Sequence, residues 1–513
     1  MDGLPKLPAE YLEVNYDVSE APASARTPLP AIGQIKAPLP FGVSDIYWAD
    51  VVSANCLTSG DDVKKVYDLV LDVKNFPHTL VPGDTIGICP RNNSEEVEKL
   101  LDRLGVKDHL DIMCQISVRA DCGKKKASVP PHIPEVSTLR EIFESCLDLH
   151  AVPKKLFIRA LLEYTSDPED HESLSELCSR KGDGYTEWIA SGRSYLEALL
   201  QDHRSCLPPI NVVLEHMPRL LPRPYSIAYF SGEAETHVHI AFSLTEFIIP
   251  GGKRRGVCTG WLETLTAPLR RTSDGEAEAA LCSQVEALSL SPEGKPSIQI
   301  PIFMRASSFF HAPADLSRPV IMIGPGVGVA PFVGFLQQRE KQLKDKNLIK
   351  VSRCWLFYGC RYPLRDMIYS NEIKKHVLNG TLDRYMVAHS RDKSSPKYVQ
   401  DNIRLHLQDV CQMILEEDAY IFVCGDAAGM ARDVLSVIRD SIAKYKNIPK
   451  TEAQKILMEL QAAGRYKEDT WTVQDDAVRM YSKAMADDKK RQEMNNAIVA
   501  SGPEQTFVVC DVV

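Results

Sequence analysis

A run of alternating glycines in the last third of the chain constrains its fold more than any other feature. Pro319 to Ile323 is a short apolar run, and it breaks at Gly324, Gly326 and Gly328 before an amphipathic segment begins. This order predicts a buried strand, a tight turn and the start of a helix. Glycines without Cβ atoms let backbone N–H groups approach a pyrophosphate, and a helix N-terminus adds partial positive charge. The spacing differs from G-x-G-x-x-G, so an ordinary strand-to-helix turn remains an alternative here.

The length and composition describe a globular protein of several domains. A chain of 513 residues with 44% hydrophobic and 25% charged residues is too long for one core, and we expect roughly two to four domains. The net charge of −9 gives no reason to expect nucleic acid as a partner. No apolar run has the length of a membrane span, so we expect no membrane contact. The 14 cysteines form no Cys-x-x-Cys motif, which favours a reducing, cytoplasmic location.

Periodicity of the apolar residues divides the chain further. Alternating segments predict strands on both sides of a stretch with helical spacing, and strands and helices then alternate regularly to the end of the folded part. We therefore predict a combined all-β and α/β protein: an antiparallel β-barrel interrupted by a helical connecting insert, followed by a doubly wound parallel sheet. The predicted segments are a flexible linker (1–42), the first half of the barrel (43–134), the insert (135–217), the second half of the barrel (218–312), the parallel-sheet domain (313–471) and a C-terminal tail of unknown role (472–513).

Polar residues follow three further strands of the predicted parallel sheet. The strands end in Cys360-Arg361, Ser390-Arg391 and Cys424-Gly425-Asp426. Ligands of open α/β sheets bind at the carboxyl ends of the strands, so we expect these residues in one crevice.

The same domain carries a candidate site for a ribose 2′-phosphate. The acidic residue that would bind an NAD ribose is missing about 20 residues after the glycine turn, where lysines stand instead. Arg391 is the expected charged partner of a 2′-phosphate, which predicts NADPH rather than NADH. The surrounding candidates are Ser390, Lys397 and Tyr398. A solvated basic loop is the alternative.

Two motifs in the second half of the barrel suggest a planar ring and a diphosphate. The first is Arg223-Pro224-Tyr225-Ser226, and the second is Gly256-Val257-Cys258-Thr259. An arginine, an aromatic face and a glycine that opens a helix suit such a ligand, although Tyr225 could equally be a core tyrosine. His237 and His239 alternate on a predicted strand, but no third ligand lies near them, and we predict no metal site.

Taken in order, the motifs resemble the diflavin reductases. The motifs are Arg-x-Tyr-Ser, Gly-Val-Cys-Thr, Gly-Pro-Gly-x-Gly-Val-Ala-Pro-Phe, Ser-Arg…Lys-Tyr-Val-Gln, Cys-Gly-Asp-Ala-x-x-Met-Ala-Arg-Asp and a late Asp-x-Trp. They span about residues 40 to 471. The resemblance implies an FAD-binding barrel and a ferredoxin–NADP-reductase-like NADPH domain, with FAD and NADPH as cofactors.

The resemblance also implies roles for individual residues. Tyr225 would lie against the isoalloxazine, Arg223 would bind the diphosphate, and Thr259 would add a hydroxyl. Trp471 would cover the flavin and move aside for nicotinamide, unless it is a terminal core tryptophan. Catalytic roles would fall to Ser226, Cys424, Asp469 and Trp471; FAD contacts to Arg223, Pro224, Tyr225, Ser226, Gly256, Val257, Cys258, Thr259 and Trp471; and NADPH contacts to Gly324, Gly326, Val327, Gly328, Ser390, Arg391, Lys397, Tyr398, Gln400 and Asp433.

Within the family, the linker and the insert are most similar to the branch that delivers electrons to the cobalamin enzyme methionine synthase. The pointers are Leu7-Pro-Ala-Glu-Tyr-Leu-Glu-Val, Pro153-Lys-Lys-Leu-Phe-Ile-Arg-Ala-Leu and Tyr164-Thr-Ser-Asp. Methionine synthase with bound cobalamin is therefore the partner that the resemblance implies. The alternatives are a reductase for a haem or iron–sulfur partner, or a catalytically idle isoform that binds methionine synthase.

Three departures from the family pattern bear on function. Nothing before residue 43 predicts the flavodoxin-like FMN domain, so FMN is expected only if such a domain is supplied elsewhere. Val327 replaces the threonine usual in the glycine turn, and the loss of a hydroxyl worth about 0.5–1.5 kcal/mol predicts weaker NADPH binding. The family ends one residue after the tryptophan, whereas 42 residues follow Trp471 here. This tail could cover the flavin and regulate the enzyme, or it could be a loosely held appendage.

Overall fold

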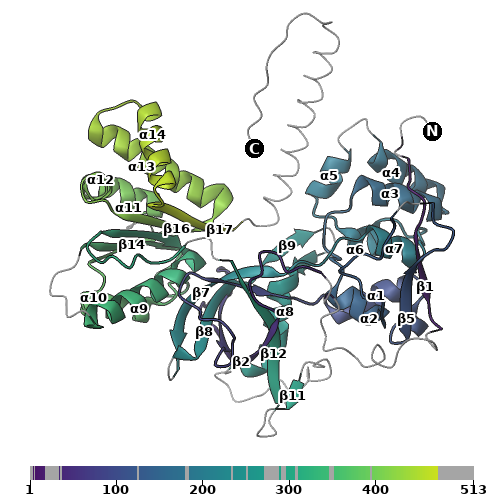
Figure 1. Cartoon of the computed structure of the whole chain (residues 1–513). Helices are drawn as coiled ribbons and strands as arrows, with labels where there is room; N and C mark the ends of the chain where they lie inside the picture. Colours follow the sequence, from purple (N-terminus) through teal and green to yellow (C-terminus); the bar gives the residue numbers. More distant parts are fainter. Residues whose placement is uncertain are drawn as a thin grey trace, which may run out of the picture.

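The chain folds into three lobes in a row, with a β-barrel in the middle (Figure 1). The computed structural model describes residues 4, 6–17, 34, 37–123, 126–179, 184–232, 235–249, 252–270, 288–290, 296–306, 310–345, 352–392 and 396–471. The predicted tail (472–513) lies outside the described residues.

Six antiparallel strands close the central barrel. Their order is β12-β2-β3-β8-β7-β4, and β4 pairs with β12 as well as with β7, which closes the ring. The strands are β2 (Tyr47–Cys56), β3 (Val66–Asp72), β4 (Thr85–Ile88), β7 (Arg223–Ser231), β8 (His237–Ser243) and β12 (Pro296–Arg305). Alternate residues point inward, and helix α8 (Val257–Leu265) adds Cys258, Leu262 and Leu265 to the same core. The short β11 (Leu288–Leu290) pairs with β12, β9 (Glu246–Ile249) pairs with β10 (Gly252–Arg255), and one 3-10 turn, η6 (Ala267–Leu269), follows α8.

A helical lobe stands on one side of the barrel (Figure 1). Local capping sets its helix starts: the Asn93 side chain accepts Glu96 N–H at 3.1 Å, and the Asp167 side chain accepts Glu169 N–H just before Pro168. The helices are α1 (Ser94–Arg103), α2 (Leu139–Ser145), α3 (Lys155–Leu161), α4 (Pro168–Cys178), α5 (Gly184–Ala190), α6 (Tyr195–Glu197) and α7 (Ile210–His216), with shorter turns η2 (Lys107–His109), η3 (Leu162–Tyr164) and η4 (Ala198–Asp202).

The helical lobe begins earlier than the predicted residue 135. Val97, Leu100 and Leu101 of α1 lie in one core with Leu139 and Phe143 of α2. Strand β5 (Met113–Val118) also belongs here, because it pairs with β6 (Val136–Thr138) and not with a barrel strand. The structure therefore divides residues 43–134 between two lobes, and the barrel's first three strands end at Ile88.

Part of the predicted linker is folded. Residues Leu12–Asn15 form β1, which pairs antiparallel with β5. Glu215 anchors this strand, since one carboxylate oxygen accepts both Tyr11 N–H and Leu12 N–H at 2.7 Å. The Leu12 side chain is fully buried in the core of the helical lobe. Within residues 1–42, this stretch is thus an ordered edge strand rather than a linker.

The third lobe is a five-stranded parallel sheet with helices on both faces, which confirms the predicted doubly wound parallel sheet. The strand order is β15-β14-β13-β16-β17, which places the glycine-turn strand β13 in the centre. The strands are β13 (Val320–Pro325), β14 (Cys354–Cys360), β15 (Arg384–His389), β16 (Tyr420–Asp426) and β17 (Tyr466–Trp471). The helices are α9 (Ala330–Asp345), α10 (Ser370–Leu378), α11 (Val399–Leu405), α12 (Leu407–Leu415), α13 (Arg432–Lys446) and α14 (Lys450–Ala462), with short turns η8 (Gly326–Val329) and η9 (Ala427–Ala431).

The two faces of this sheet bury different partners. Ile321 and Ile323 lie in a core with side chains of α11 to α14. Val320 and Met322 point the other way, into a core shared with α9, α10 and barrel residues such as Ala228. A Cβ on Gly334 of α9 would lie 2.1 Å from the carbonyl oxygen of Ala228, so the helix backbone rests directly on β7. The parallel-sheet domain is thereby fixed against the outside of the barrel.

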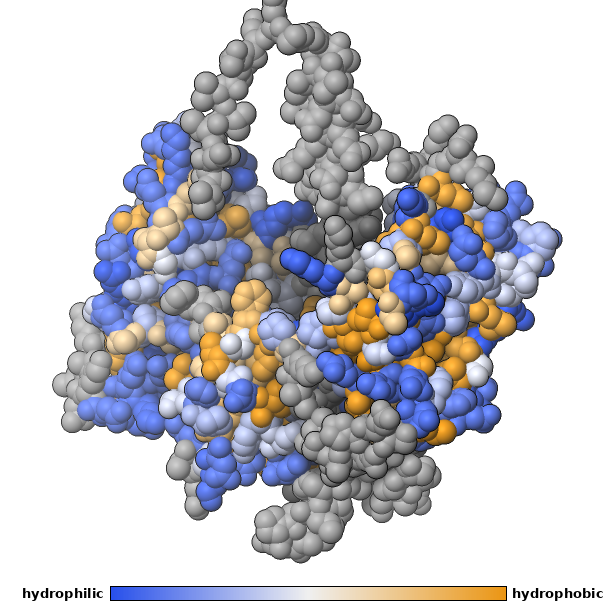
Figure 2. Space-filling model, turned by 45° about the vertical axis from the view of Figure 1, so that its right-hand side comes forward, coloured by the Kyte–Doolittle hydropathy of each residue, from blue (hydrophilic) through white to orange (hydrophobic). Residues whose placement is uncertain are grey.

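The surface is mixed in character. Figure 2 shows hydrophilic residues around the edge of the visible face and hydrophobic ones gathered toward its middle. Within the described part of the chain, no helix has the length and apolar character needed to cross a membrane.

Candidate functional site

The glycine turn has the geometry of a strand that passes at once into a helix. Gly326 has a φ of +57°, which favours glycine, and a Cβ built there would meet nothing within 4 Å. Gly324 and Gly328 have the opposite surroundings: a Cβ on Gly324 would lie 2.3 Å from the carbonyl oxygen of Gly328, and one on Gly328 would lie 2.1 Å from that of Cys424. Two glycines therefore allow close backbone packing, while the third leaves an open, concave backbone.

The structure brings together three of the residues predicted to be catalytic. The Ser226 hydroxyl of β7 donates a hydrogen bond to Asp469 Oδ2 of β17. The Cys424 thiol of β16 lies 3.9 Å from the same carboxylate oxygen. Cys424 and Asp469 are direct partners in the β16–β17 register, so the sheet itself places them side by side. The site is a seam, because Ser226 comes from the barrel and the other two residues come from the parallel-sheet domain.

Burial sets the protonation behaviour of this seam. It raises the pKa of Asp469, whereas the hydrogen bonds from Ser226 and Cys424 lower it. Burial, reinforced by the Asp469 charge, raises the pKa of the Cys424 thiol well above its ordinary value, so this sulfur stays protonated. A neutral thiol and a hydroxyl are thus both hydrogen-bond donors to the Asp469 carboxylate.

The last strand also positions Trp471. In the β16–β17 register Trp471 is opposite Asp426, two residues beyond the Cys424–Asp469 pair. Its side chain is 43% exposed, which does not fit the alternative of a terminal core tryptophan.

Asp426 was expected in the crevice as part of a strand end, but the sequence analysis gave it no individual role. Its carboxylate accepts Gly429 N–H at 2.7 Å and Met430 N–H at 3.3 Å, and so it caps the turn η9 that leads into α13. Gly425 before it has a φ of +151°, and a Cβ there would lie 2.4 Å from Met430 Cε. An aspartate directly after a buried strand was the signal that could have identified this cap.

The barrel supplies a second helix start near Ser226. Gly256 precedes α8, and no side chain of the described residues caps this helix. Thr245 N–H donates to Thr259 Oγ1 at 3.2 Å, and a Cβ on Gly256 would lie 3.0 Å from Thr259 Oγ1 and from Thr245 Cβ. The first amides of α8, from Val257 onward, consequently remain donors for an anion.

Tyr225 and Arg223 lie on β7 next to this helix. Tyr225 is half-buried against the barrel core, and burial raises the pKa of its hydroxyl, with a smaller effect from the neighbouring Cys258. The Arg223 guanidinium is 3.5 Å from Asp148 of the helical lobe. Pro224, between them, pairs with Gly87 of β4 and is exposed. The ring of Tyr225 therefore lies at the barrel's edge, with one polar contact to α8.

Two further polar groups near this edge have buried atoms without a partner among the described residues. They are Nη2 of Arg219 and Nε2 of His132. Arg219 otherwise donates to Gln34 Oε1 at 2.6 Å, and its charge acts together with burial to lower the pKa of His132 to about 4. Of these two atoms, Nη2 of Arg219 is a donor that a polar ligand beside the barrel could use. Neither residue stood in a recognisable motif.

The predicted 2′-phosphate residues gather on one loop beyond β15. Backbone bonds from Ser390 N–H to Cys360 O (2.9 Å) and from Arg391 N–H to Arg361 O (3.1 Å) place this loop beside the end of β14. The Lys397 ammonium lies 5.2 Å from the centre of the Tyr398 ring. Arg391, Lys397 and Tyr398 are exposed, and Gln400 follows in the first turn of α11.

Two other predicted NADPH residues differ in their surroundings. Asp433 is exposed in the first turn of α13. Val327 is half-buried and packs against the core under the sheet. Arg361 was also expected at the crevice, as the residue after β14. Its guanidinium already has a partner, because it donates to Asp62 O at 2.9 Å.

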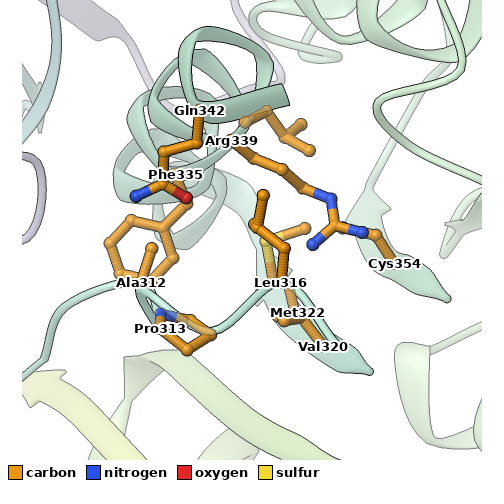
Figure 3. Close-up of a pocket in the computed structure, with 10 residues that line it drawn as sticks. Ala312, Pro313, Leu316, Val320, Met322, Phe335, Arg339, Gln342 and Cys354 are labelled. Carbon is orange, nitrogen blue, oxygen red and sulfur yellow. The ribbon is translucent and has the colours of Figure 1, made fainter. Parts of the chain in front are cut away.

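A small apolar cavity lies elsewhere in the parallel-sheet domain (Figure 3). It is lined by Val320, Met322 and Cys354 at the amino ends of the strands, and Arg339 extends along it toward Cys354. Ligands of such sheets bind at the opposite ends, so this cavity is separate from the seam. No group of three potential metal ligands occurs among the residues that the structure describes.

The donor groups fit FAD and NADPH. The uncapped start of α8 and the unpartnered Nη2 atom of Arg219 suit a diphosphate, and the open backbone at Gly326 admits a second one. Cys424 lies on β16, the strand next to β13 of the glycine turn, whereas Ser226 lies on the barrel strand β7.

Comparisons with known proteins agree with this arrangement. The family model of an FAD binding domain matches residues 39–261, and that of an oxidoreductase NAD-binding domain matches residues 322–436. Methionine synthase reductase of Rattus norvegicus is 38% identical over 482 residues, and that of Homo sapiens is 36% identical over 484 residues; each alignment covers 91% of this chain and 66% of the relative. NADPH–cytochrome P450 reductase of Cavia porcellus is 31% identical over 440 residues, covering 84% of this chain and 60% of the relative.

The chain thus spans about two thirds of the length of the curated relatives that it matches. The barrel, the parallel sheet and the two matching domains together account for the motifs on which the resemblance depended. The chain therefore carries the FAD-binding and NAD-binding domains expected of an NADPH-dependent FAD oxidoreductase, and it is similar to methionine synthase reductase over 91% of its length.

Proposed function

We propose that this chain reduces FAD with NADPH at the seam of Ser226, Cys424 and Asp469. The observation that supports this most directly is the convergence of Ser226 and Cys424 on a single oxygen of Asp469, from two different domains. When bound, FAD and NADPH would supply the redox chemistry, which is the transfer of a hydride (two electrons and one proton) from the nicotinamide to the flavin.

The contribution of the protein is electrostatic and geometric. Nicotinamide gains positive charge when it loses hydride, and the Asp469 carboxylate would stabilise that charge in a partly desolvated position. Ser226 and Cys424 hold the carboxylate in one rotamer, because both donate to Oδ2. The Cys424 thiol stays protonated and adds no competing negative charge.

Coenzyme selection would depend on the loop after β15. Arg391 is the proposed partner of the 2′-phosphate, with Ser390, Lys397, Tyr398 and Gln400 around it. The open backbone at Gly326 and the adjacent Gly324 and Gly328 would hold the diphosphate, and Asp433 would approach the nicotinamide side. Val327 has no hydroxyl to offer, which is the reason for expecting a moderate NADPH affinity.

On the barrel, the start of α8 and Arg223 would bind the FAD diphosphate. Tyr225 would contact the isoalloxazine on one side and Trp471 on the other. The half-buried position of Tyr225 and the exposure of Trp471 support this assignment.

For the destination of the electrons we propose the reductive reactivation of cob(II)alamin methionine synthase. This rests on the similarity to methionine synthase reductases over 91% of the chain. FMN would take part through a flavodoxin-like domain supplied by another polypeptide or by further sequence. For location we propose the cytoplasm, because the cysteines among the described residues are free thiols.

Two other functions remain as outcomes of the tests. A reductase for a haem or iron–sulfur partner is favoured by the 31% identity with NADPH–cytochrome P450 reductase. It would be identified by haemoprotein reduction that exceeds cobalamin reactivation once an FMN domain is added. A catalytically idle isoform that binds methionine synthase would be colourless, or its flavin would not bleach.

The decisive experiment is anaerobic stopped-flow of the FAD-loaded chain with NADPH and, separately, with NADH. We expect fast bleaching of the flavin absorbance with NADPH and slow bleaching with NADH. Equal rates would contradict the 2′-phosphate site, and no bleaching with either coenzyme would contradict the proposed function.

A further inference from the structure

We propose that Asp68, His239 and Tyr369, with Ser231 and Tyr229, are positioning residues that fix the NADPH-binding domain on the barrel for hydride transfer. These five residues are called the inter-domain clamp below. The inference rests on the proposed function, since it concerns the alignment of the same seam.

The clamp is a continuous buried network across two domains. Tyr369 of the parallel-sheet domain donates its hydroxyl proton to Asp68 Oδ1 at 2.7 Å. Asp68 Oδ2 lies 2.8 Å from His239 Nδ1, and His239 Nε2 lies 2.7 Å from Ser231 Oγ. Asp68, His239 and Tyr369 are 5%, 8% and 4% exposed, so the two bonds to Asp68 are buried, and the bond between His239 and Ser231 is partly buried.

Aromatic rings enclose the network. The Tyr229 ring stacks on the His239 ring at a centroid distance of 3.9 Å and an angle of 17°. The same ring meets Tyr369 edge to face at 5.6 Å. Burial raises the pKa of Tyr369 and of Tyr229, and the negative charges of Asp68 and Glu372 add to this effect. Both phenols thus remain proton donors.

Strand alternation explains why these polar residues are available at the interface. Tyr67, Leu69 and Leu71 of β3 point into the barrel core. Asp68 points outward between them, where a polar residue would ordinarily meet solvent. It is buried because Tyr369 and the residues around it cover this face of the barrel. Burying the Asp68 carboxylate without partners would cost free energy, so its contacts with Tyr369 and His239 are required.

Tyr369 is held in an uncommon backbone conformation. Its φ is +53° and its ψ is 24°, immediately before α10. A left-handed conformation is unfavourable for a bulky residue. The contacts of its ring and hydroxyl with the barrel must therefore maintain it, and such outliers mark places where surrounding structure imposes a geometry.

The clamp shares a strand with the seam. Ser231 and Tyr229 lie on β7, a few residues from Ser226 of the hydride-transfer site. The Gln337 side chain of α9 strengthens this docking, since it donates to Phe230 O at 2.8 Å and accepts Phe230 N–H at 3.1 Å. The position of β7 against the second domain therefore sets the approach of Ser226 to Asp469. Small misplacements of reacting groups reduce rates strongly.

The order Asp68–His239–Ser231 resembles that of hydrolase triads, but the surroundings contradict such a role. The Tyr229 ring covers the His239 ring, and His239 itself is buried. A positioning role accounts for the burial, which a hydrolase would not need.

The test compares Tyr369→Phe with Tyr67→Phe in the FAD-loaded protein. Both changes remove a buried phenol that donates to a buried carboxylate, since Tyr67 donates to Glu263 Oε1 at 3.1 Å. Only the first bond crosses between domains. We expect Tyr369→Phe to slow flavin reduction by NADPH about tenfold, equivalent to about 1.4 kcal/mol. The dissociation constant for NADP+ should change less than twofold, and Tyr67→Phe should reduce flavin at nearly the wild-type rate.

Hydrogen exchange gives a second readout that needs no catalysis. In Tyr369→Phe, but not in Tyr67→Phe, exchange should rise in peptides over β7 and β17. Equal rates of flavin reduction in both variants, or equal exchange at these strands, would overturn the proposal. If wild-type flavin is not bleached at all, the proposed function fails, and the exchange comparison still decides whether the clamp exists. Asp68→Asn should reproduce the Tyr369→Phe pattern, and a wild-type pattern in it would also count against the clamp.

Discussion

Gly328 and Cys424 approach each other so closely that a Cβ on the glycine would lie 2.1 Å from the cysteine carbonyl oxygen. The glycine turn and strand β16 are thus in direct backbone contact. The turn therefore leaves room for a phosphate and also fixes the position of Cys424 relative to the start of α9.

The two glycines Gly328 and Gly326 should respond differently to alanine. We expect Gly328→Ala to destabilise the protein by about 3 kcal/mol, because backbone must move against backbone. Gly326→Ala should cost about 1 kcal/mol for its positive φ, while its methyl group occupies the open concave surface and weakens NADPH binding. Urea unfolding and NADP+ titration measure the two effects. A Gly328→Ala variant with wild-type stability would show that the backbone contact is readily relaxed.

Arg391 should determine the preference for NADPH. A charge-assisted hydrogen bond contributes about 1.5–3 kcal/mol, so Arg391→Ala should weaken NADPH binding about 10- to 100-fold and leave NADH nearly unchanged. Arg404→Ala is the matched control, since this exposed arginine pairs with Asp401 at 2.8 Å on the neighbouring helix. Titration of each variant with NADPH and with NADH measures the two affinities. A parallel loss of NADPH and NADH affinity would place the 2′-phosphate elsewhere.

Asp469 should impose a pH dependence on flavin reduction. Its folded pKa is raised from 3.8, so its carboxylate loses charge at a pH above that of an ordinary aspartate. The rate should fall as pH drops through this raised pKa, and Asp469→Asn should be about 100-fold slower with a flat profile in that range. Stopped-flow between acid and neutral pH provides the measurement.

The same raised pKa has a consequence for stability. Because the pKa of Asp469 is raised in the folded state, this residue stabilises the fold most at a pH below 3.8. That contribution is lost as the pH rises through the pKa of the folded state. The unfolding free energy of Asp469→Asn relative to wild type should therefore increase from acid to neutral pH. A constant difference across this range would mean that Asp469 is not desolvated.

Trp471 should influence coenzyme choice with little effect on stability. Because its side chain is 43% exposed, Trp471→Ala should cost less than about 1 kcal/mol, whereas a core tryptophan would cost about 3–5 kcal/mol. Without the ring, nicotinamide from NADH should gain access, and the ratio of NADPH to NADH rates should fall. Loss of bound FAD in this variant would instead show that Trp471 is structural.

Local sequence features predicted those parts of the fold that depend on near neighbours. The glycine turn, the strand before it and the helix after it follow from a single run of residues, and the parallel sheet confirms them. The motif at Arg223 lies on the barrel strand β7, and the motif at Gly256 lies at the start of α8. Each of these required only a few adjacent side chains.

Long-range relations escaped the sequence analysis for a physical reason. Leu12–Asn15 looked like linker because its partner strand is about 100 residues away, and α1 looked like part of the barrel because its core contacts lie beyond residue 139. His239 was considered only as a possible metal ligand, since neither Asp68 nor Tyr369 is close to it in sequence. That network forms only because the two domains pack together, so no local sequence pattern predicts it.

Strand β17 is the last described element of the chain, and it carries Asp469 as well as Trp471. During synthesis, the barrel and the first four strands of the parallel sheet leave the ribosome before the carboxylate that Ser226 and Cys424 both bind. Each new molecule therefore lacks the complete seam of Ser226, Cys424 and Asp469 until its final strand adds to the edge of the sheet. A chain terminated before Tyr466 would retain both anion sites and lack the group that joins them.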